Sequence, residues 1–175
     1  MRVLLFCALA LLSVLSACAT PSQPTAMAVS GVSVASKSSE TVSITVTGGR
    51  VTSSTYVSQI SDADFREALR QSILKSALFS QVLDDNSGRY RLGAYIGALT
   101  QPLMGMSLTV DLEVSYTLVD STTGKAVWQQ SIATSYTATG SDSIVAATRL
   151  RLANEAAARK NIEAAIAAMG NLGVR

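Results

Sequence analysis

One long run of alternating residues constrains the fold of this chain more than any other feature. Between residues 108 and 118 every second residue is apolar: Leu108, Val110, Leu112, Val114, Tyr116 and Leu118. The residues between them are polar: Thr109, Asp111, Glu113, Ser115 and Thr117. Side chains of a strand alternate between two faces, so this run predicts a strand with one buried and one solvated face. The pattern is typical of an antiparallel sheet covered on a single face.

Two further strands are predicted on either side of this run. Alternating apolar residues cover residues 90–98, and Trp128, Ile132 and Tyr136 form one row of a return strand. The polar segment 120–125 contains Gly124 and predicts a hairpin turn. Together these segments predict a three-stranded antiparallel meander. We interpret Asp111 and Glu113 as part of its solvated face rather than as a catalytic pair.

Two helices and an earlier strand complete the predicted domain. Ser61 stands three residues before Asp64, the spacing of a capping box, and predicts a helix that ends near Phe79. A second, alanine-rich helix is predicted from residues 140–142 to about Met169. Its predicted apolar stripe runs through Val145, Thr148, Leu152, Ala156, Ile162, Ile166 and Met169.

The predicted fold class is α+β. Residues 29–46 predict one or two strands, with Val42, Ile44 and Val46 alternating in the second. The element order is therefore β-α-β-β-β-α. We expect an antiparallel or mixed sheet of four to five strands with two helices packed on one face.

The N-terminal segment predicts export and a lipid anchor. Arg2 precedes an apolar run over residues 3–15, and small residues lead to Cys18 in the sequence Leu-Ser-Ala-Cys. A transmembrane helix or an ordinary secretory signal is the alternative, but a span needs about 20 apolar residues and polar residues interrupt this run too early. We expect residues 1–17 to be a signal peptide, residues 18–27 a lipidated tether, and residues 28–175 a single periplasmic domain.

This segment resembles the signal of bacterial lipoproteins, in which the chain is cut before a cysteine that then receives acyl chains. All four positions of that motif match at residues 15–18. The resemblance implies lipidation of Cys18 with fatty acids such as palmitate. By the rule for such proteins, Ala19 implies transfer to the outer membrane, where the protein would face the periplasm.

Composition excludes several kinds of chemistry. The chain has no histidine, so a Ser-His-Asp relay or a histidine-bearing zinc site cannot form. It has two cysteines, of which Cys7 would leave with the signal. Loss of Arg2 would take the formal charge from +2 to +1, which makes no electrostatic case for nucleic acid. We therefore predict no catalytic residues, no metal and no cofactor.

One apolar loop and one group of basic residues are candidates for contact with a partner. The loop between two predicted meander strands contains Pro102, Leu103, Met104 and Met106. If exposed, these residues would suit a partner protein or acyl chains; folding inward against the core is the interpretation we favour. The basic residues are Arg149, Arg151, Arg159 and Lys160, which could form a patch for lipid phosphates. Acidic residues lie between them, so a solvated helix face is the favoured interpretation.

A resemblance also extends over the domain. The segment 61–69, the turn at residues 120–124 and Trp128 resemble small envelope lipoproteins, such as lipopolysaccharide-assembly lipoproteins of the LptE kind and the auxiliary lipoproteins of ABC transport systems. These are patterns of fold more than of activity, and only Cys18 carries over as a functional residue. The first hypothesis is a non-enzymatic, lipid-anchored protein that binds or scaffolds an envelope-assembly or transport partner, because such a role needs no cluster of reactive residues. The alternative is a carrier of an acylated lipid or lipopolysaccharide, with a cavity lined by Ile96, Leu112 and Ile162. An enzyme of unrecognised type is the third hypothesis.

Overall fold

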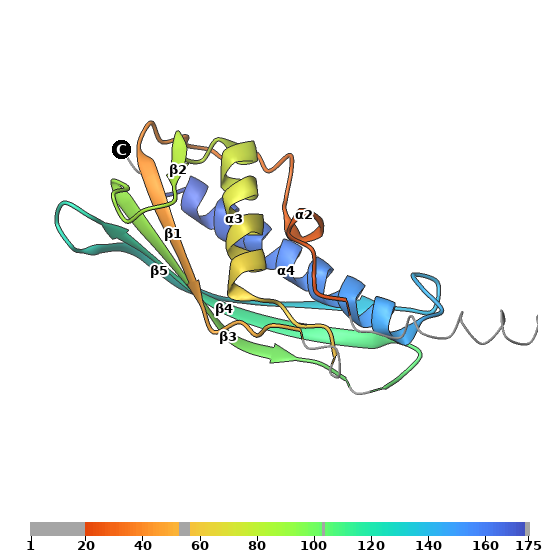
Figure 1. The fold of residues 1–175 in the computed structure, drawn as a ribbon. Coiled ribbons are helices and arrows are strands. Elements are labelled where there is room, and N and C mark those ends of the chain that lie inside the picture. The colour runs from red at the N-terminus through yellow and green to blue at the C-terminus, as the bar shows by residue number, and fades with distance from the viewer. Residues whose placement is uncertain (1–19, 53–56, 103, 174–175) are drawn as a thin grey trace, which may run out of the picture.

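The chain forms one mixed five-stranded sheet with its helices on one face (Figure 1). A computed structural model describes residues 20–52, 57–102 and 104–173. The elements in chain order are α2 (Pro24–Met27), β1 (Thr41–Thr47), α3 (Asp62–Ser76), β2 (Gln81–Leu83), β3 (Tyr90–Thr100), β4 (Leu108–Asp120), β5 (Ala126–Ala138) and α4 (Ala146–Gly170). The strand order is β2-β1-β3-β4-β5. The predicted α+β class and the mixed sheet are confirmed.

The predicted meander is confirmed. β3 pairs antiparallel with β4, and β4 pairs antiparallel with β5. β1 lies on the other side of β3 and pairs with it in parallel, from Val42 opposite Tyr90 to Thr47 opposite Tyr95. The three-residue strand β2, which was not predicted, extends the sheet by pairing in parallel with the start of β1. Residues 29–34 form no strand.

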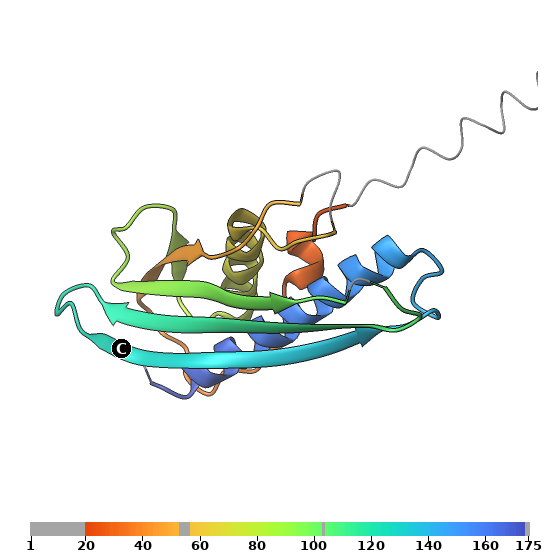
Figure 2. The same ribbon diagram turned by 90° about the horizontal axis from the view of Figure 1, so that it is seen from below.

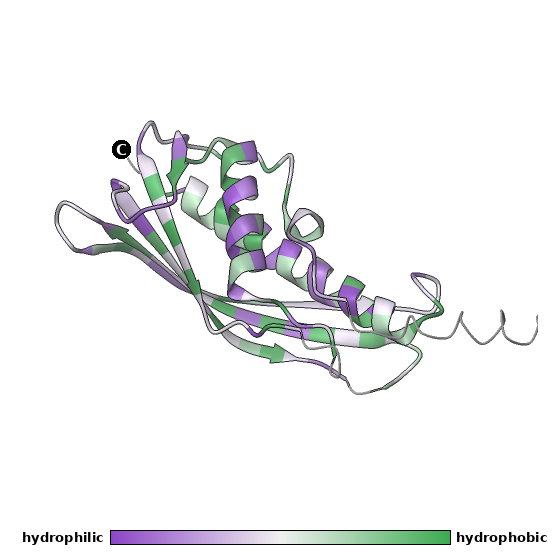
Figure 3. Ribbon diagram, in the orientation of Figure 1, coloured by the Kyte–Doolittle hydropathy of each residue, from purple (hydrophilic) through white to green (hydrophobic). Residues whose placement is uncertain are grey.

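The alternation along β4 divides the sheet into a dry and a wet face, as predicted. Its apolar row from Leu108 to Leu118 is buried, while Asp111 and Glu113 are exposed. Apolar and polar colours alternate along the strands in Figure 3. Viewed from below in Figure 2, the outer face of β3, β4 and β5 is open and α4 lies behind it. The hydrophobic core therefore fills the space between the sheet and the helices.

α3 begins where the cap predicts. The Ser61 hydroxyl oxygen accepts a hydrogen bond from the Asp64 backbone N–H at 3.1 Å, which satisfies one of the free N–H groups of the first turn. The predicted inward residues of this helix, from Phe65 to Ile73, are buried. The helix ends at Ser76 because Ala77 adopts a left-handed conformation with φ +53°.

α4 begins later than predicted, and its predicted stripe is confirmed in part. The buried members are Ala156, Ile162, Ile166 and Met169, whereas Thr148 and Leu152 are half-buried. It starts at Ala146, and Val145, expected inside, is 54% exposed. Alanine makes several faces of this helix similarly apolar, so the period alone did not mark every buried position. The buried face also carries polar residues among its alanines and includes Asn154, Glu155 and Asn161.

The folded domain begins before the expected boundary at residue 28. Ser22 and Met27 are buried, and the Gln23 backbone N–H donates to Glu155 Oε1 at 2.9 Å. The four-residue helix α2 contacts both α3 and α4. The prediction of a tether over residues 18–27 is therefore wrong for residues 22–27, because Met27 inserts an apolar side chain into the core. Cys18 and residues 1–17 lie outside the described residues.

Candidate functional site

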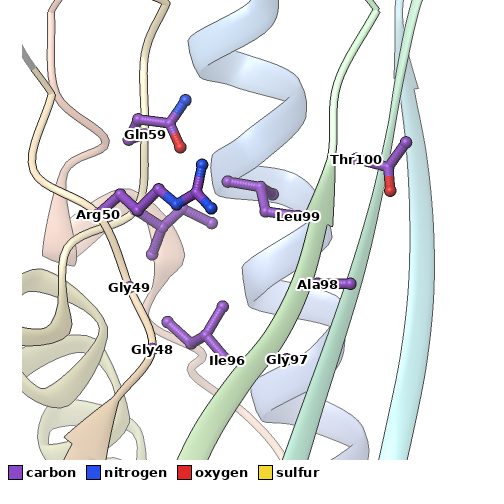
Figure 4. A pocket seen from close by; sticks show the side chains of 10 residues that line it. Gly48, Gly49, Arg50, Gln59, Ile96, Gly97, Ala98, Leu99 and Thr100 are labelled. Carbon is purple, nitrogen blue, oxygen red and sulfur yellow. The ribbon is translucent and has the colours of Figure 1, made fainter.

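A pocket of about 250 Å³ opens at the edge of the sheet, where β1 ends and β3 continues (Figure 4). Ile96 and Leu99 point into it from β3, and Arg50 faces them from the other side. The full lining is Gly48, Gly49, Arg50, Gln59, Ile60 and the residues 96–100 of β3. We call this the edge pocket.

The edge pocket exists because β1 is shorter than β3. The β1–β3 ladder stops at Thr47 opposite Tyr95, and Gly48 then turns the chain away with φ +92°. A β-carbon at Gly48 would lie 2.4 Å from the Ile96 carbonyl oxygen, so only glycine permits this close passage. Within the described residues, no strand pairs with residues 96–100 on the side away from β4.

The far wall of the edge pocket is held by amide side chains. Gln101 Nε2 donates to the Ser58 carbonyl oxygen at 2.8 Å and to Asn154 Oδ1 at 2.7 Å. Gln59 Nε2 donates to Gln101 Oε1 at 3.0 Å. Because Asn154 is fully buried on α4, this network fixes residues 58–60 to the helix layer. The wall is therefore built to hold its shape.

The chemistry of the edge pocket suits polar recognition. Its lining carries the exposed Arg50 guanidinium and the backbone of three glycines, and it contains no carboxylate, thiol or hydroxyl other than that of Thr100. In the described part of the chain, no group of three or more Asp, Glu, His or Cys side chains is placed to hold a metal ion. Unpaired peptide groups and a guanidinium can hydrogen-bond to the backbone of another polypeptide.

The apolar loop that the sequence singled out is exposed at Met104 and Met106, which are 86% and 83% exposed. The favoured interpretation, that this loop folds inward, is therefore wrong for both methionines. Pro102 is half-buried, and Leu103 lies outside the described residues. The loop does not line the edge pocket, so the structure separates these two features.

The four basic residues of α4 do not form one surface. Arg149 is buried, and its guanidinium donates to the carbonyl oxygens of Ser143, Ile144 and Gly105 at 2.8, 3.0 and 3.1 Å. Arg151 pairs with the buried Glu155 at 2.8 Å. Arg159 and Lys160 are exposed further along the helix. Arg149 therefore joins the loop at residues 101–107 to the loop at residues 139–145.

The three residues expected to line a lipid cavity do not line one together. Ile96, Leu112 and Ile162 are all buried in the hydrophobic core, and of the three only Ile96 also lines the edge pocket. Neither the edge pocket nor the two shallow pockets on the outer sheet face is lined by all three. The residues that sequence reasoning missed are Gly48 and Arg50. The Gly-Gly pair after a predicted strand was their one signal.

Comparisons with known proteins relate the chain to others through its fold. No protein family model and no curated protein sequence matches it. Protein XCC0632 from Xanthomonas campestris, of the family DUF330, superposes with a TM-score of 0.67 at 12% identity, over 89% of this chain and 97% of that chain. Protein CT253 from Chlamydia trachomatis superposes with a TM-score of 0.52 at 9% identity, over 75% of this chain and 96% of that chain.

A third structure is named as a lipoprotein. The minor lipoprotein from Acinetobacter baumannii has a TM-score of 0.48 at 10% identity, over 76% of this chain and 92% of that chain. At such identities the likeness shows the fold alone. The fold that the chain shares is shown by XCC0632 and CT253.

Proposed function

We propose that this chain is a lipid-anchored envelope protein with a non-enzymatic scaffold role, which binds an extended segment of a partner protein at the edge pocket. Cys18 would carry the acyl chains and place the protein at the outer membrane, facing the periplasm. The motif at residues 15–18 supports the anchor. The fold shared with the bacterial proteins XCC0632 and CT253 is compatible with this assignment.

The main support for the binding role is that β3 extends beyond the end of β1. A strand edge with free peptide groups is a template for a further strand, because its N–H and C=O groups gain partners when an extended segment is added. Residues 96–100 offer five residues of such an edge. Arg50 lies across from them and favours a segment that brings a carboxylate or carbonyl oxygens.

The alternative is a carrier of an acylated lipid. It needs an apolar cavity large enough for an acyl chain, and none of the three pockets found along the described residues is lined by all the residues expected to line one. The edge pocket is lined largely by backbone and polar groups. These observations favour the scaffold role over lipid carriage.

A photo-crosslinking experiment tests the binding role. A photoreactive amino acid replaces Arg50 or Ala98 in the native lipidated protein in cells, and Val127, exposed at the other end of the sheet, is the matched control position. We expect the same envelope protein to be captured from positions 50 and 98 and not from 127. Equal capture from all three positions, or capture of lipid alone from the pocket positions, would contradict the proposal.

A charge-reversal pair tests the part played by Arg50. Arg50→Glu reverses the charge of Arg50, the one charged residue in the described lining of the edge pocket. Arg91→Glu makes the same change at an exposed position of β3 that does not line the pocket. We expect Arg50→Glu to reduce recovery of the crosslinked partner by about tenfold, the effect of losing a charge-assisted contact. Arg91→Glu should leave recovery unchanged.

A further inference from the structure

Four exposed apolar side chains gather at one end of the domain. Met104 and Met106 come from the loop between β3 and β4, and Ile144 and Val145 come from the loop before α4. Ile144 is 92% exposed, the largest value among the large apolar residues of the described chain. We call these four residues the apolar tip. Exposed apolar residues are ordinary when scattered singly, whereas a group of them marks a contact surface.

Arg149 connects the two loops that carry the apolar tip. Its guanidinium is buried beneath both loops and donates to Gly105, between the two methionines, and to Ser143 and Ile144 in the other loop. Both views of the molecule show these loops side by side at one end (Figures 1 and 2). A buried charge that hydrogen-bonds three carbonyl groups is costly to displace, so the two loops are held together.

The start of the described chain lies close to the same end. Ser22 is buried and its N–H donates to the Gln59 carbonyl oxygen, while the Gln23 N–H donates to Glu155. Four residue steps separate Cys18 from Ser22, so Cys18 lies within about 14 Å of Ser22 even if that segment is fully extended. Glu155 itself lies nine residues from the start of α4, about 14 Å along the helix.

These lengths allow an acylated Cys18 to reach the level of the apolar tip. We infer that the apolar tip inserts its side chains into the surface of the lipid bilayer that holds the anchor, which fixes the orientation of the domain on the membrane. This inference rests on the proposed lipid anchor. The bilayer is the occupant favoured over a partner protein, because so short a connection keeps this end of the domain close to the membrane when the acyl chains are inserted.

The charges near the apolar tip set its depth. Asp142 lies in the loop at residues 139–145, where its carboxylate accepts hydrogen bonds from the Thr139 N–H at 2.7 Å and from the Thr139 hydroxyl at 3.0 Å. These bonds lower the pKa of Asp142 below its ordinary value, so it stays charged at neutral pH. A charged carboxylate belongs at the level of the lipid headgroups, so the inferred insertion is shallow.

Spin labels on the lipidated protein test this inference. Labels are attached at Met104→Cys and Ile144→Cys, with Val127→Cys as the matched exposed control at the far end of β4 and β5. The protein is reconstituted in vesicles of phosphatidylethanolamine and phosphatidylglycerol. Power saturation then compares the access of oxygen, which enters the bilayer, with that of a water-soluble nickel complex. We expect the ratio of oxygen to nickel access to rise several-fold at 104 and 144 and to stay unchanged at 127.

Two measurements distinguish failure of the lipid anchor from failure of membrane insertion by the apolar tip. Vesicle flotation is measured first, and protein that does not float with the vesicles contradicts the lipid anchor itself. If the protein floats but labels 104 and 144 remain as open to nickel as label 127, the anchor stands and the insertion of the apolar tip is overturned. Shielding of both labels from oxygen and nickel alike would show a protein contact and would also overturn it.

Discussion

Asn161 shows how one buried amide can connect three elements. It is fully buried on α4, and its Nδ2 donates to the Ile132 carbonyl oxygen of β5 at 2.7 Å. Its Oδ1 accepts from the Tyr116 hydroxyl of β4 at 2.8 Å. Burial raises the pKa of Tyr116 far above its ordinary value, so this phenol stays a hydrogen-bond donor. The residue therefore fixes the position of α4 over the centre of the sheet.

Replacing Asn161 with leucine should destabilise the domain strongly. The Tyr116 hydroxyl and the Ile132 carbonyl oxygen would both lose a partner where water has no access. We expect the free energy of unfolding to fall by about 2–4 kcal/mol, measured by urea denaturation.

Asn154→Leu is not a suitable comparison because it breaks a different network; the matched control is Asn171→Leu, just beyond the end of the same helix and exposed. It should change the free energy of unfolding by less than about 0.5 kcal/mol. Equal effects of the two changes would contradict the role given to Asn161.

At the scale of elements, the sequence predicted those helices and strands whose formation depends on interactions between residues close in the chain. The alternation in β4 and the Ser61 cap act within a few residues, so the meander and α3 were foreseen. The parallel pairing of β1 with β3 joins segments 48 residues apart, and nothing in either segment encodes it. Helix α2 has four residues and depends on Met27 packing between α3 and α4. The edge pocket was not predicted because it depends on the parallel pairing of β1 with β3, two distant segments, and on their unequal lengths.

An ion pair joins Asp120, at the end of β4, to Arg89, which precedes β3, and should make the stability of the domain depend on pH. Asp120 accepts hydrogen bonds from the Arg89 guanidinium and from the N–H groups of Thr122 and Thr123. The Arg89 guanidinium is the main cause that lowers the pKa of Asp120 from 3.8 to about 2. A lowered pKa in the folded state means that this contribution is complete above about pH 4 and is lost as the pH falls toward about 2.

Asp120→Asn tests this dependence. The variant cannot lose a charge, so we expect its thermal midpoint to fall less than that of the unmodified protein as the pH drops from about 4 to about 2. Glu67, whose pKa Arg70 lowers to about 2, contributes over the same range and leaves a residual slope in this variant. Parallel curves for the two proteins would show that the Asp120 pair does not act in this way.

At the scale of the whole molecule, the segment that follows the proposed anchor at Cys18 belongs to the fold. Residues 22–27 pass from the buried Ser22 to the buried Met27 and contact α4 on the way. The resemblance to lipoproteins of the LptE kind and to auxiliary lipoproteins of ABC transport systems stays a prediction. Partner and lipid depend on contacts outside a single chain, which no pattern within it can encode.

Truncation of the Met27 side chain should therefore lower the stability of the entire domain. Met27→Ala removes a fully buried side chain between two helices, and we expect a loss of about 2–4 kcal/mol in the free energy of unfolding. Thr25→Ala, an exposed position of the same short helix, should cost less than about 0.5 kcal/mol. Urea denaturation of both variants in a Cys18→Ser background measures the difference. If residues 22–27 were a free tether, neither change would alter the free energy of unfolding.

The length of β4 gives the molecule a further property, that of a spacer. Its 13 residues run from the loop of the apolar tip to the turn at Asp120, a distance of about 40 Å for an extended strand. With the tip on the bilayer, that turn would stand as far from the lipids as a small domain is wide. A partner bound at the edge pocket would lie nearer to the bilayer than that turn does. The two ends of β4 would thus lie at a short and a long distance from the membrane, and other envelope proteins could contact the domain at either distance.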